Sequence, residues 1–334
     1  MNGVGVCGLG AVSPAGWGRL SLREALARST SLPATSLEAP ENLRGLRVPP
    51  PAPRPPAFAH PRLRRASPIA QFAVAAALEA LDQSNRSSGR LGVVFCTTCG
   101  PLHYTRRFLT EAVADPSTAS PVLFPETVFN AAASHLASFL GAEAPSTTLI
   151  GDSGVVLEGI ALAARWLLDR TFDTCLVIAA EELDWSVAAG WQPFSRSVLP
   201  SEGAAALCLV LPSAPHPLAT LERVTAPLLY SPGISREIAA SRVRDQLGPS
   251  TPGELLCDSL LGIPVLDRPE HSAWTNWTGP RLSPKLVLGE ALAAGAGWQC
   301  VAAIDALSTS PAPAARISIV GLNTQAIGAR FLHP

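Results

Sequence analysis

The side chain best placed for chemistry is a serine where an apolar run meets a segment of helical periodicity. Ser153 follows Thr-Thr-Leu-Ile at residues 147–150 and stands between Gly151 and Gly154. A sharp strand-to-helix turn lifts such a side chain above a sheet edge and directs the amides of the helix N-terminus toward any bound group. The same amides can stabilise an oxyanion, so Ser153 is a candidate nucleophile. The alternative interpretation is that Ser153 only caps the helix.

A second pair of reactive side chains, Cys96 and Cys99, has the spacing of a redox disulfide or of half a zinc site. No second pair and no nearby pair of histidines completes a metal-binding set, and most of the seven cysteines lie in apolar runs. An odd number of cysteines in such surroundings predicts reduced, buried thiols in a cytoplasmic protein. We therefore interpret this pair as structural and expect neither a metal nor a cofactor.

The composition excludes several classes of protein. Apolar residues make up 47% of the 334 residues and charged residues 15%, against a typical charged share of about 25%, which excludes intrinsic disorder. The net charge is −1, so no basic surface predicts nucleic-acid binding. The longest apolar stretches fall short of the ~20 residues that span a bilayer, and residues 1–10 lack the basic leader of a signal peptide. A chain with so few charges suits a large protein–protein interface.

The elements that must position Ser153 alternate between apolar strands and helices. Strands are predicted at residues 3–9, 91–96, 147–150, 174–180, 204–211, 219–224, 254–257, 316–320 and 327–332. Helices are predicted at residues 21–27, 67–81, 126–140, 155–168, 236–247 and 289–307, the last preceded by residues 285–288. This order predicts an α/β fold with a parallel or mixed sheet that is covered on both faces.

The chain divides into two halves that repeat this pattern, residues 1–212 and residues 213–334. The first half contains a proline-rich excursion at residues 39–66, which we predict to be an extended surface segment rather than part of the core. It is either a solvated loop or a docking site for an acidic partner on Arg62, Arg64 and Arg65.

Several segments, taken in order, resemble the β-ketoacyl synthase family of the thiolase superfamily over essentially the whole chain. Residues 4–14 resemble the opening strand and turn of that family, and residues 128–136 resemble the helix before its nucleophile strand. Residues 147–181 resemble the nucleophile strand, the helix after it and a strand of the dimer core. Ser-Glu-Gly-Ala at 201–204 and Gly-Leu-Asn-Thr at 321–324 resemble two of its glycine-containing stretches. The resemblance implies a thiolase-like layered fold of two pseudo-repeated halves.

The positions that match the family's catalytic residues carry different side chains. The nucleophilic cysteine of the family matches Ser153, its first histidine matches Ser259 and its second histidine matches Glu290. The resemblance also implies candidates for the substrate pocket or the oxyanion donors, namely Lys285, Leu322 and Asn323.

This change of side chains argues against ordinary condensation. Claisen condensation in the family uses a thiolate and two neutral imidazoles, whereas a serine is far less acidic and a glutamate carboxylate repels an enolate. Residues 262–270 resemble the chain length factors of type II polyketide synthases, which also lack the catalytic trio. We therefore expect a non-condensing partner of an active ketosynthase in polyketide or fatty-acid-like biosynthesis, served by an acyl carrier protein. It would be a heterodimer with that synthase or a homodimer, with residues 130–140 and 174–180 at the interface.

The alternative is a serine-dependent acyltransferase or hydrolase that acts on acyl-carrier-protein thioesters. Ser153 would accept the acyl group, Glu290 would be the acid/base, and Ser259 or Asp258 would assist. A serine–glutamate pair is a poor proton relay without a histidine between the two. Asp152 or His271 could contribute if the surrounding loop folds inward. We favour the partner-subunit hypothesis.

Overall fold

We describe the protein from a computed structural model, which describes residues 3–38, 42–85, 89–140, 145–211 and 217–334. In these residues a 12-stranded sheet runs through both halves of the chain. The path through the first half is β6 (Ser146–Ile150), β5 (Leu91–Thr97), β7 (Thr174–Glu181), β8 (Gly203–Val210) and β1 (Val4–Ser13). The path continues through β9 (Ala219–Val224), β14 (Gln325–Leu332), β13 (Ala314–Val320), β11 (Leu255–Cys257) and β12 (Arg281–Leu282).

The two halves of the sheet have the same topology. In the first half β5 runs parallel to β6 and β7, and β8 runs antiparallel to β7 and β1. In the second half β11 runs parallel to β12 and β13, and β14 runs antiparallel to β13 and β9. The antiparallel pairing of β1 with β9 joins the halves. The predicted layered α/β fold of two pseudo-repeated halves is confirmed.

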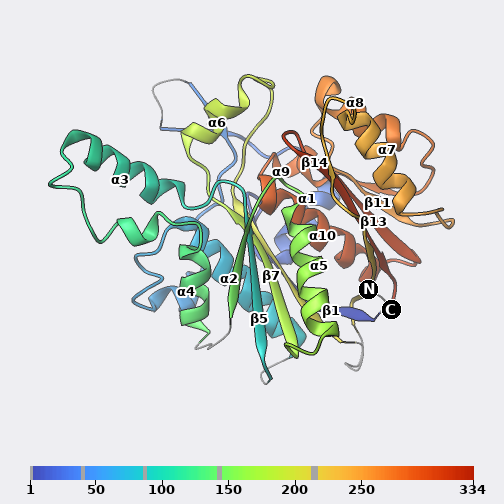
Figure 1. The fold of residues 1–334 in the computed structure, drawn as a ribbon, viewed down its shortest axis with the longest axis horizontal. Helices are drawn as coiled ribbons and strands as arrows, with labels where there is room; N and C mark the ends of the chain where they lie inside the picture. The colour runs from blue at the N-terminus through green and yellow to red at the C-terminus, as the bar shows by residue number, and fades with distance from the viewer. Residues whose placement is uncertain (1–2, 39–41, 86–88, 141–144, 212–216) are drawn as a thin grey trace.

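The helices form three layers around the two half-sheets (Figure 1). The central layer is α5 (Val155–Leu168) and α10 (Leu292–Thr309), which lie between the half-sheets in the largest apolar cluster. The outer layer of the first half is α2 (Pro68–Ser84) and α4 (Ala131–Phe139), and that of the second half is α7 (Arg236–Gln246) and α8 (Pro264–Ala273). The other helices are α1 (Arg19–Arg28), α3 (Leu102–Ala114), α6 (Trp185–Trp191) and α9 (Pro284–Leu288).

Small residues let the central helices approach the strands closely. A Cβ added at Gly159 of α5 would lie 2.6 Å from the Sγ of Cys96 on β5. A Cβ added at Gly297 of α10 would lie 2.7 Å from the Cβ of Ala205 on β8. Both distances are below van der Waals contact, so these glycines set how deeply the two helices sit between the half-sheets.

Short elements complete the chain. These are the strands β2 (Gly16–Trp17), β3 (Thr35–Ser36), β4 (Arg44–Gly45) and β10 (Leu228–Leu229), and the 3₁₀ turns η1 (Pro56–Ala59) and η2 (Phe124–Glu126). No helix of the described residues is long and apolar enough to cross a membrane. The expected boundary between residues 212 and 213 lies outside the described residues.

Two predictions about secondary structure are wrong. The helix predicted over residues 126–140 begins only at Ala131, because residues 127–130 form turns after η2. Residues 285–288 are themselves helical, in α9, instead of merely leading into the long helix.

The prediction that residues 39–66 lie outside the core is also wrong. Phe58 and Leu63 are fully buried in the outer cluster of the first half, where Phe58 makes an edge contact with Trp17. Burying two large apolar side chains contributes several kcal/mol, about 1.5–3 for each, which fixes this segment against α2. Arg62, Arg64 and Arg65 remain exposed on its outer side.

Candidate functional site

Ser153 lies in the turn between β6 and α5, as the sequence predicts, but it is buried, with an exposure of 3%. The position of the N-cap belongs to Gly154 and no side chain caps α5, so the capping interpretation is wrong. A Cβ at Gly154 would lie 2.5 Å from Ile327 on β14, so glycine is needed where the turn meets the second half of the sheet. None of the described residues hydrogen-bonds the Ser153 hydroxyl.

The neighbouring residue, Asp152, ties this turn to the loop between β13 and β14. Its Oδ1 accepts the backbone N–H of Ser153 at 2.8 Å. Its Oδ2 accepts the backbone N–H groups of Asn323 at 3.2 Å and Thr324 at 2.9 Å. The carboxylate therefore binds amides of both the turn and the loop and holds the two together. Both oxygens of Asp152 are thus engaged by backbone amides.

Glu290 forms a buried ion pair with Lys285. The Nζ of Lys285 donates to Oε2 of Glu290 at 2.7 Å, and both side chains are at most 3% exposed. The other carboxylate oxygen, Oε1, accepts the backbone N–H of Leu292 at 2.7 Å. Both oxygens are thus bound just before α10, and the carboxylate stabilises that turn.

Ser259 is held in the same way by a buried acid. Its hydroxyl donates to Oε2 of Glu270 at 2.5 Å and accepts the backbone N–H of Val320 at 3.1 Å. Burial, together with the nearby carboxylate of Asp258, raises the pKa of Glu270 to about 7. Sequence reasoning misses Glu270 as a site residue. The signal that could have found it is an acid at a helical spacing from the apolar Leu266, on the side of α8 that faces the sheet.

The structure brings some of the predicted site residues together and separates others. Ser259, Lys285, Glu290 and Leu322 line one cavity of about 10 Å³, beside Glu270, whereas Ser153 and Asn323 do not line it. A single water needs about 10–15 Å³, so this cavity holds no acyl group.

Leu322 also contacts apolar residues outside this cavity, whereas Asn323 and His271 do not line it. Leu322 packs against an apolar cluster whose residues come mainly from α6, α8 and α10. The residues of this cluster are Trp191, Val198, Leu266 and Leu292. The side chains of Asn323 and His271 are exposed, so His271 does not meet the condition under which it could assist Ser153.

The two cysteines of the spaced pair are in the first half of the molecule. Cys96 is buried on β5, where its Sγ donates to the carbonyl of Val155 on α5 at 3.6 Å, and burial raises the pKa of its thiol. Burial and the carboxylate of Glu181 raise the pKa of Cys99 to about 12. Such thiols stay protonated at neutral pH and react slowly. Among the described residues, no group of His, Cys, Asp and Glu side chains is placed to hold a metal ion.

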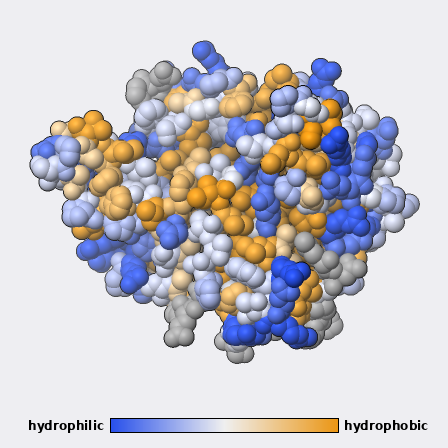
Figure 2. Space-filling view, in the orientation of Figure 1, coloured by the Kyte–Doolittle hydropathy of each residue, from blue (hydrophilic) through white to orange (hydrophobic). Residues whose placement is uncertain are grey.

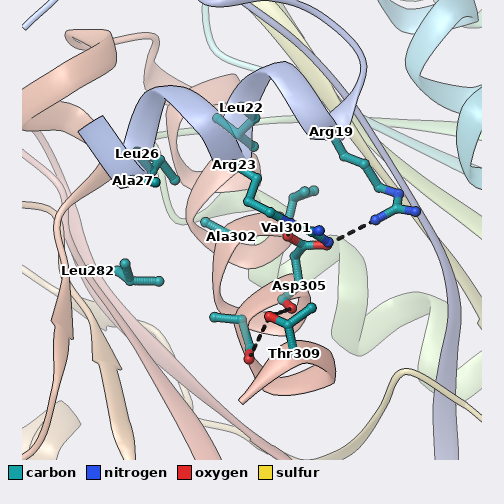
Figure 3. Close-up of a pocket in the computed structure, with 11 residues that line it drawn as sticks. Arg19, Leu22, Arg23, Leu26, Ala27, Leu282, Val301, Ala302, Asp305 and Thr309 are labelled. Carbon is teal, nitrogen blue, oxygen red and sulfur yellow. Dashed lines mark hydrogen bonds and ion pairs between the residues drawn. The ribbon is translucent and has the colours of Figure 1, made fainter. Parts of the chain in front are cut away.

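A separate cleft of about 180 Å³ lies between α1, α10 and β12, and none of the predicted site residues lines it (Figure 3). Its walls are mostly apolar, and at one side Arg19 and Arg23 both bind the carboxylate of Asp305. Arg23 binds through two nitrogens, each 2.5 Å from an oxygen. The two arginines thus neutralise the acid and fasten α1 to α10.

Comparison with known proteins gives one family and a set of similar folds. Residues 42–235 match the family model described as "Beta-ketoacyl synthase, N-terminal domain". No curated protein sequence matches this chain. Over 99% of both chains it is similar to "The ishigamide ketosynthase/chain length factor", with a TM-score of 0.80 and 22% identity.

Two other solved structures are similar over the full length of both chains. The first is a β-ketoacyl synthase from Burkholderia phymatum STM815, with a TM-score of 0.86 and 15% identity. The second is a type II polyketide synthase ketosynthase in complex with its acyl-carrier protein, with a TM-score of 0.81 and 16% identity. At these identities the similarity establishes the fold.

Proposed function

This chain belongs to the β-ketoacyl synthase family, and we propose that it acts there as a non-condensing subunit, similar to a chain length factor. Its partner would be an active ketosynthase of a type II polyketide or fatty-acid-like pathway in the cytoplasm. The observation that carries the proposal concerns the three positions that match the family's catalytic trio. Each side chain there is either bound by structural partners or has no base beside it. Ser259 is bound by Glu270, Glu290 is paired with Lys285, and Ser153 is buried in a turn that Asp152 ties to the loop between β13 and β14.

The chemistry of these groups supports the absence of condensation. A serine hydroxyl needs a base to become a nucleophile, and the described residues that line the site cavity include no histidine. Decarboxylation of a malonyl thioester places negative charge on an enolate oxygen, which a carboxylate such as Glu290 destabilises. The cavity of about 10 Å³ also leaves no space for the acyl chain.

The same observations weaken the alternative of a serine acyltransferase or hydrolase. In that mechanism Glu290 would exchange a proton with Ser153 or with the leaving thiol. Both oxygens of Glu290 are instead bound, one by the ammonium of Lys285 and one by the amide of Leu292, so neither is available for that proton transfer. Ser153 does not line the cavity that contains Glu290.

An apolar surface supports the proposed contact with a partner subunit. The arm formed by α3 and the segment through η2 exposes four large apolar side chains, by 54% to 84% of their surface, namely Leu109, Val113, Val122 and Phe124. Figure 2 shows hydrophobic residues gathered at the end of this arm. We call these four residues the arm patch. Exposed apolar groups in such number are typical of protein–protein interfaces.

The edge of the sheet offers a second contact surface. In the described chain β6 is the last strand on its side, and Ile150 at its end is 55% exposed. By contrast, every residue of β7 is buried, and β7 lies between β5 and β8. The expectation that residues 174–180 form the dimer interface is therefore wrong, because a central strand has no free edge. We place the interface on β6 and the arm patch instead.

A basic groove supports docking of an acyl carrier protein, whose surface is acidic. A groove of about 610 Å³ begins beside Ala66, at the end of the segment that exposes Arg62, Arg64 and Arg65, and it is lined by Arg106 and Arg107. Each lining arginine already binds one acid, Asp184 for Arg106 and Glu111 for Arg107. The three exposed arginines therefore contribute most of the field available to an acidic partner.

The test is complex formation with a ketosynthase that retains the Cys-His-His trio and is encoded beside this chain. We expect the two proteins to co-purify and to elute as one species in size-exclusion chromatography with light scattering. Val122→Asp combined with Phe124→Asp should abolish the complex, because it places charges in the arm patch. Val265→Asp is the matched control, since Val265 on α8 is equally exposed, at 73%, but lies on the other half.

The measurement on the chain alone separates a homodimer from a heterodimer. Monomers that combine only with the synthase support the heterodimer. A homodimer that the arm-patch variant dissociates would assign the same surface to self-association. Wild-type behaviour of the arm-patch variant, or a ketone product made by this chain alone, would contradict the proposal.

A further inference from the structure

The turn before α5 and the loop between β13 and β14 direct three backbone amides at one point. These are the N–H groups of Ser153, Asn323 and Thr324, and all three donate to the carboxylate of Asp152. Asp152 is 6% exposed, and no cationic side chain is among the groups that bind it in the described chain. The carboxylate is therefore stabilised by amide dipoles, by the N-terminus of α5 and by the hydroxyl of Thr324, which donates to Oδ2 at 3.5 Å.

Converging amides of this kind bind anions in general. In acyl transfer the amide of the nucleophilic residue and an amide from a neighbouring loop usually bind the oxyanion of the tetrahedral intermediate. Here the amide beside the candidate nucleophile Ser153 and the amides of the opposite loop are already occupied. The occupant is a carboxylate of the chain itself, from the residue immediately before Ser153.

The loop that carries two of these amides has anchors besides Asp152. The carbonyl of Gly321 accepts the hydroxyl of Tyr230 at 2.7 Å and the Nε of Arg236 at 3.2 Å. The carbonyl of Thr324 accepts the backbone N–H of Tyr230 at 2.8 Å. These bonds anchor the loop at both ends, so its amides should keep their direction when the carboxylate is removed.

We propose that the turn before α5 and the loop of residues 321–324 form a binding nest for a small carboxylate or oxyanion, which Asp152 occupies as a resident anion. Its presence keeps Ser153 from acting on acyl thioesters. This second statement rests on the proposed function, whereas the nest rests only on the geometry. Glycine at position 321 leaves room for the carboxylate in this nest, because a Cβ added there would lie 2.2 Å from Oδ2 of Asp152.

The experiment removes the resident anion and supplies a free one. Asp152→Ala leaves the three amides unpaired and should lower the Tm. Sodium formate should then raise the Tm of this variant in a saturable manner, by about 2 °C at roughly ten times its Kd. The Tm of the wild type should not respond beyond its response to sodium chloride at equal ionic strength.

Asp152→Asn is the matched control, because the carboxamide fills the same volume without the charge. It should be less stable than the wild type, since its NH₂ group meets one of the amides, and formate should not rescue it because the space is filled. If Asp152→Ala does not fold unaided, its refolding yield is measured instead, with formate and with chloride. A yield that rises with formate alone supports the nest.

Equal responses of Asp152→Ala and the wild type to formate would overturn the inference. That outcome leaves the proposed function intact, because complex formation with the ketosynthase is measured separately on the wild type. Conversely, a failure of complex formation together with formate rescue would leave the nest in place and remove the partner-subunit proposal.

Discussion

Replacing Glu290 tests whether its carboxylate has a structural or a catalytic role. The pair of Lys285 and Glu290 is buried at both ends, with side-chain exposures of 3% and 2% and a 2.7 Å contact. Glu290 also accepts the amide of Leu292, whose φ of 49° is in the left-handed region that leucine rarely adopts. The carboxylate thus compensates a buried charge and supports a strained turn at the start of α10.

Glu290→Gln removes the charge but keeps the acceptor for the Leu292 amide. It leaves the ammonium of Lys285 buried without a counter-ion, and breaking one side of a buried pair costs about 3–5 kcal/mol. Because the single oxygen of Gln is kept by the Leu292 amide, its NH₂ group faces the ammonium of Lys285, so we expect a loss of about 4 kcal/mol. Glu290→Ala should lose about 1–3 kcal/mol more, since the Leu292 amide is then also unsatisfied. These losses are large against a typical total of about 5–15 kcal/mol.

The assay is urea unfolding followed by circular dichroism, with the m value checked for constancy. Lys285→Met combined with Glu290→Gln is the control, because it removes both charges and keeps the bond to Leu292. This double variant should recover most of the lost stability and come within about 1 kcal/mol of the wild type. A single Glu290→Gln variant as stable as the wild type, or a double variant no better than the single one, would refute the structural role.

Three further outcomes are expected. The purified chain should make no ketone from acyl-carrier and malonyl-carrier thioesters, and mass spectrometry should find no acyl group on the peptide that contains Ser153; an adduct that Ser153→Ala removes would establish the nucleophile instead. Burial raises the pKa of Glu182 to about 8 and that of Glu270 to about 7, against 4.5 for a free glutamate. The folded state therefore binds these protons more tightly than the unfolded state does. The free energy of unfolding should fall as the pH rises from about 5 to about 8 and should then level off. Glu182→Gln should make this fall smaller. Arg64→Glu combined with Arg65→Glu should weaken binding of an acyl carrier protein, and the salt dependence of binding measured by titration calorimetry should decrease with it; unchanged affinity would remove these arginines from the docking surface.

Much of the fold could be predicted because apolar periodicity specifies the buried elements. The central helix α5 and the strand β9 begin and end at the predicted residues. The sequence analysis predicts neither α3 nor α8. α3 buries no residue, and its apolar residues Leu109 and Val113 are exposed, so it is not one of the core elements that apolar runs reveal. α8 contains Pro269, which ordinarily argues against a helix. Their structure depends on tertiary contacts that local sequence does not encode.

The sequence predicts where the site residues lie along the chain, but it does not predict their burial or their hydrogen-bond partners. The strand-to-helix turn correctly places Ser153, yet the neighbouring Asp152 is bound by the amides of Asn323 and Thr324, about 170 positions further along the chain. The same is true of Ser259, whose environment is set by Glu270 once α8 folds back over the sheet. A residue's type and its spacing from neighbours indicate which chemistry is available. Whether its atoms are free to perform it is decided by partners that only the folded chain brings close.

The way in which the halves are joined bears on whether either can exist alone. The ladder between β1 and β9 has three residue pairs in the described chain, from Val4 with Leu221 to Val6 with Ala219. Backbone bonds therefore contribute little to holding the halves together, and the shared apolar layer of α5 and α10 contributes most. A fragment ending after β8 would expose the side of α5 that packs against β9 and β14. A fragment starting at β9 would expose the side of α10 that packs against β7 and β8. The chain should accordingly unfold in one cooperative transition despite its length, and its two halves, expressed separately, should be rescued from aggregation only by each other.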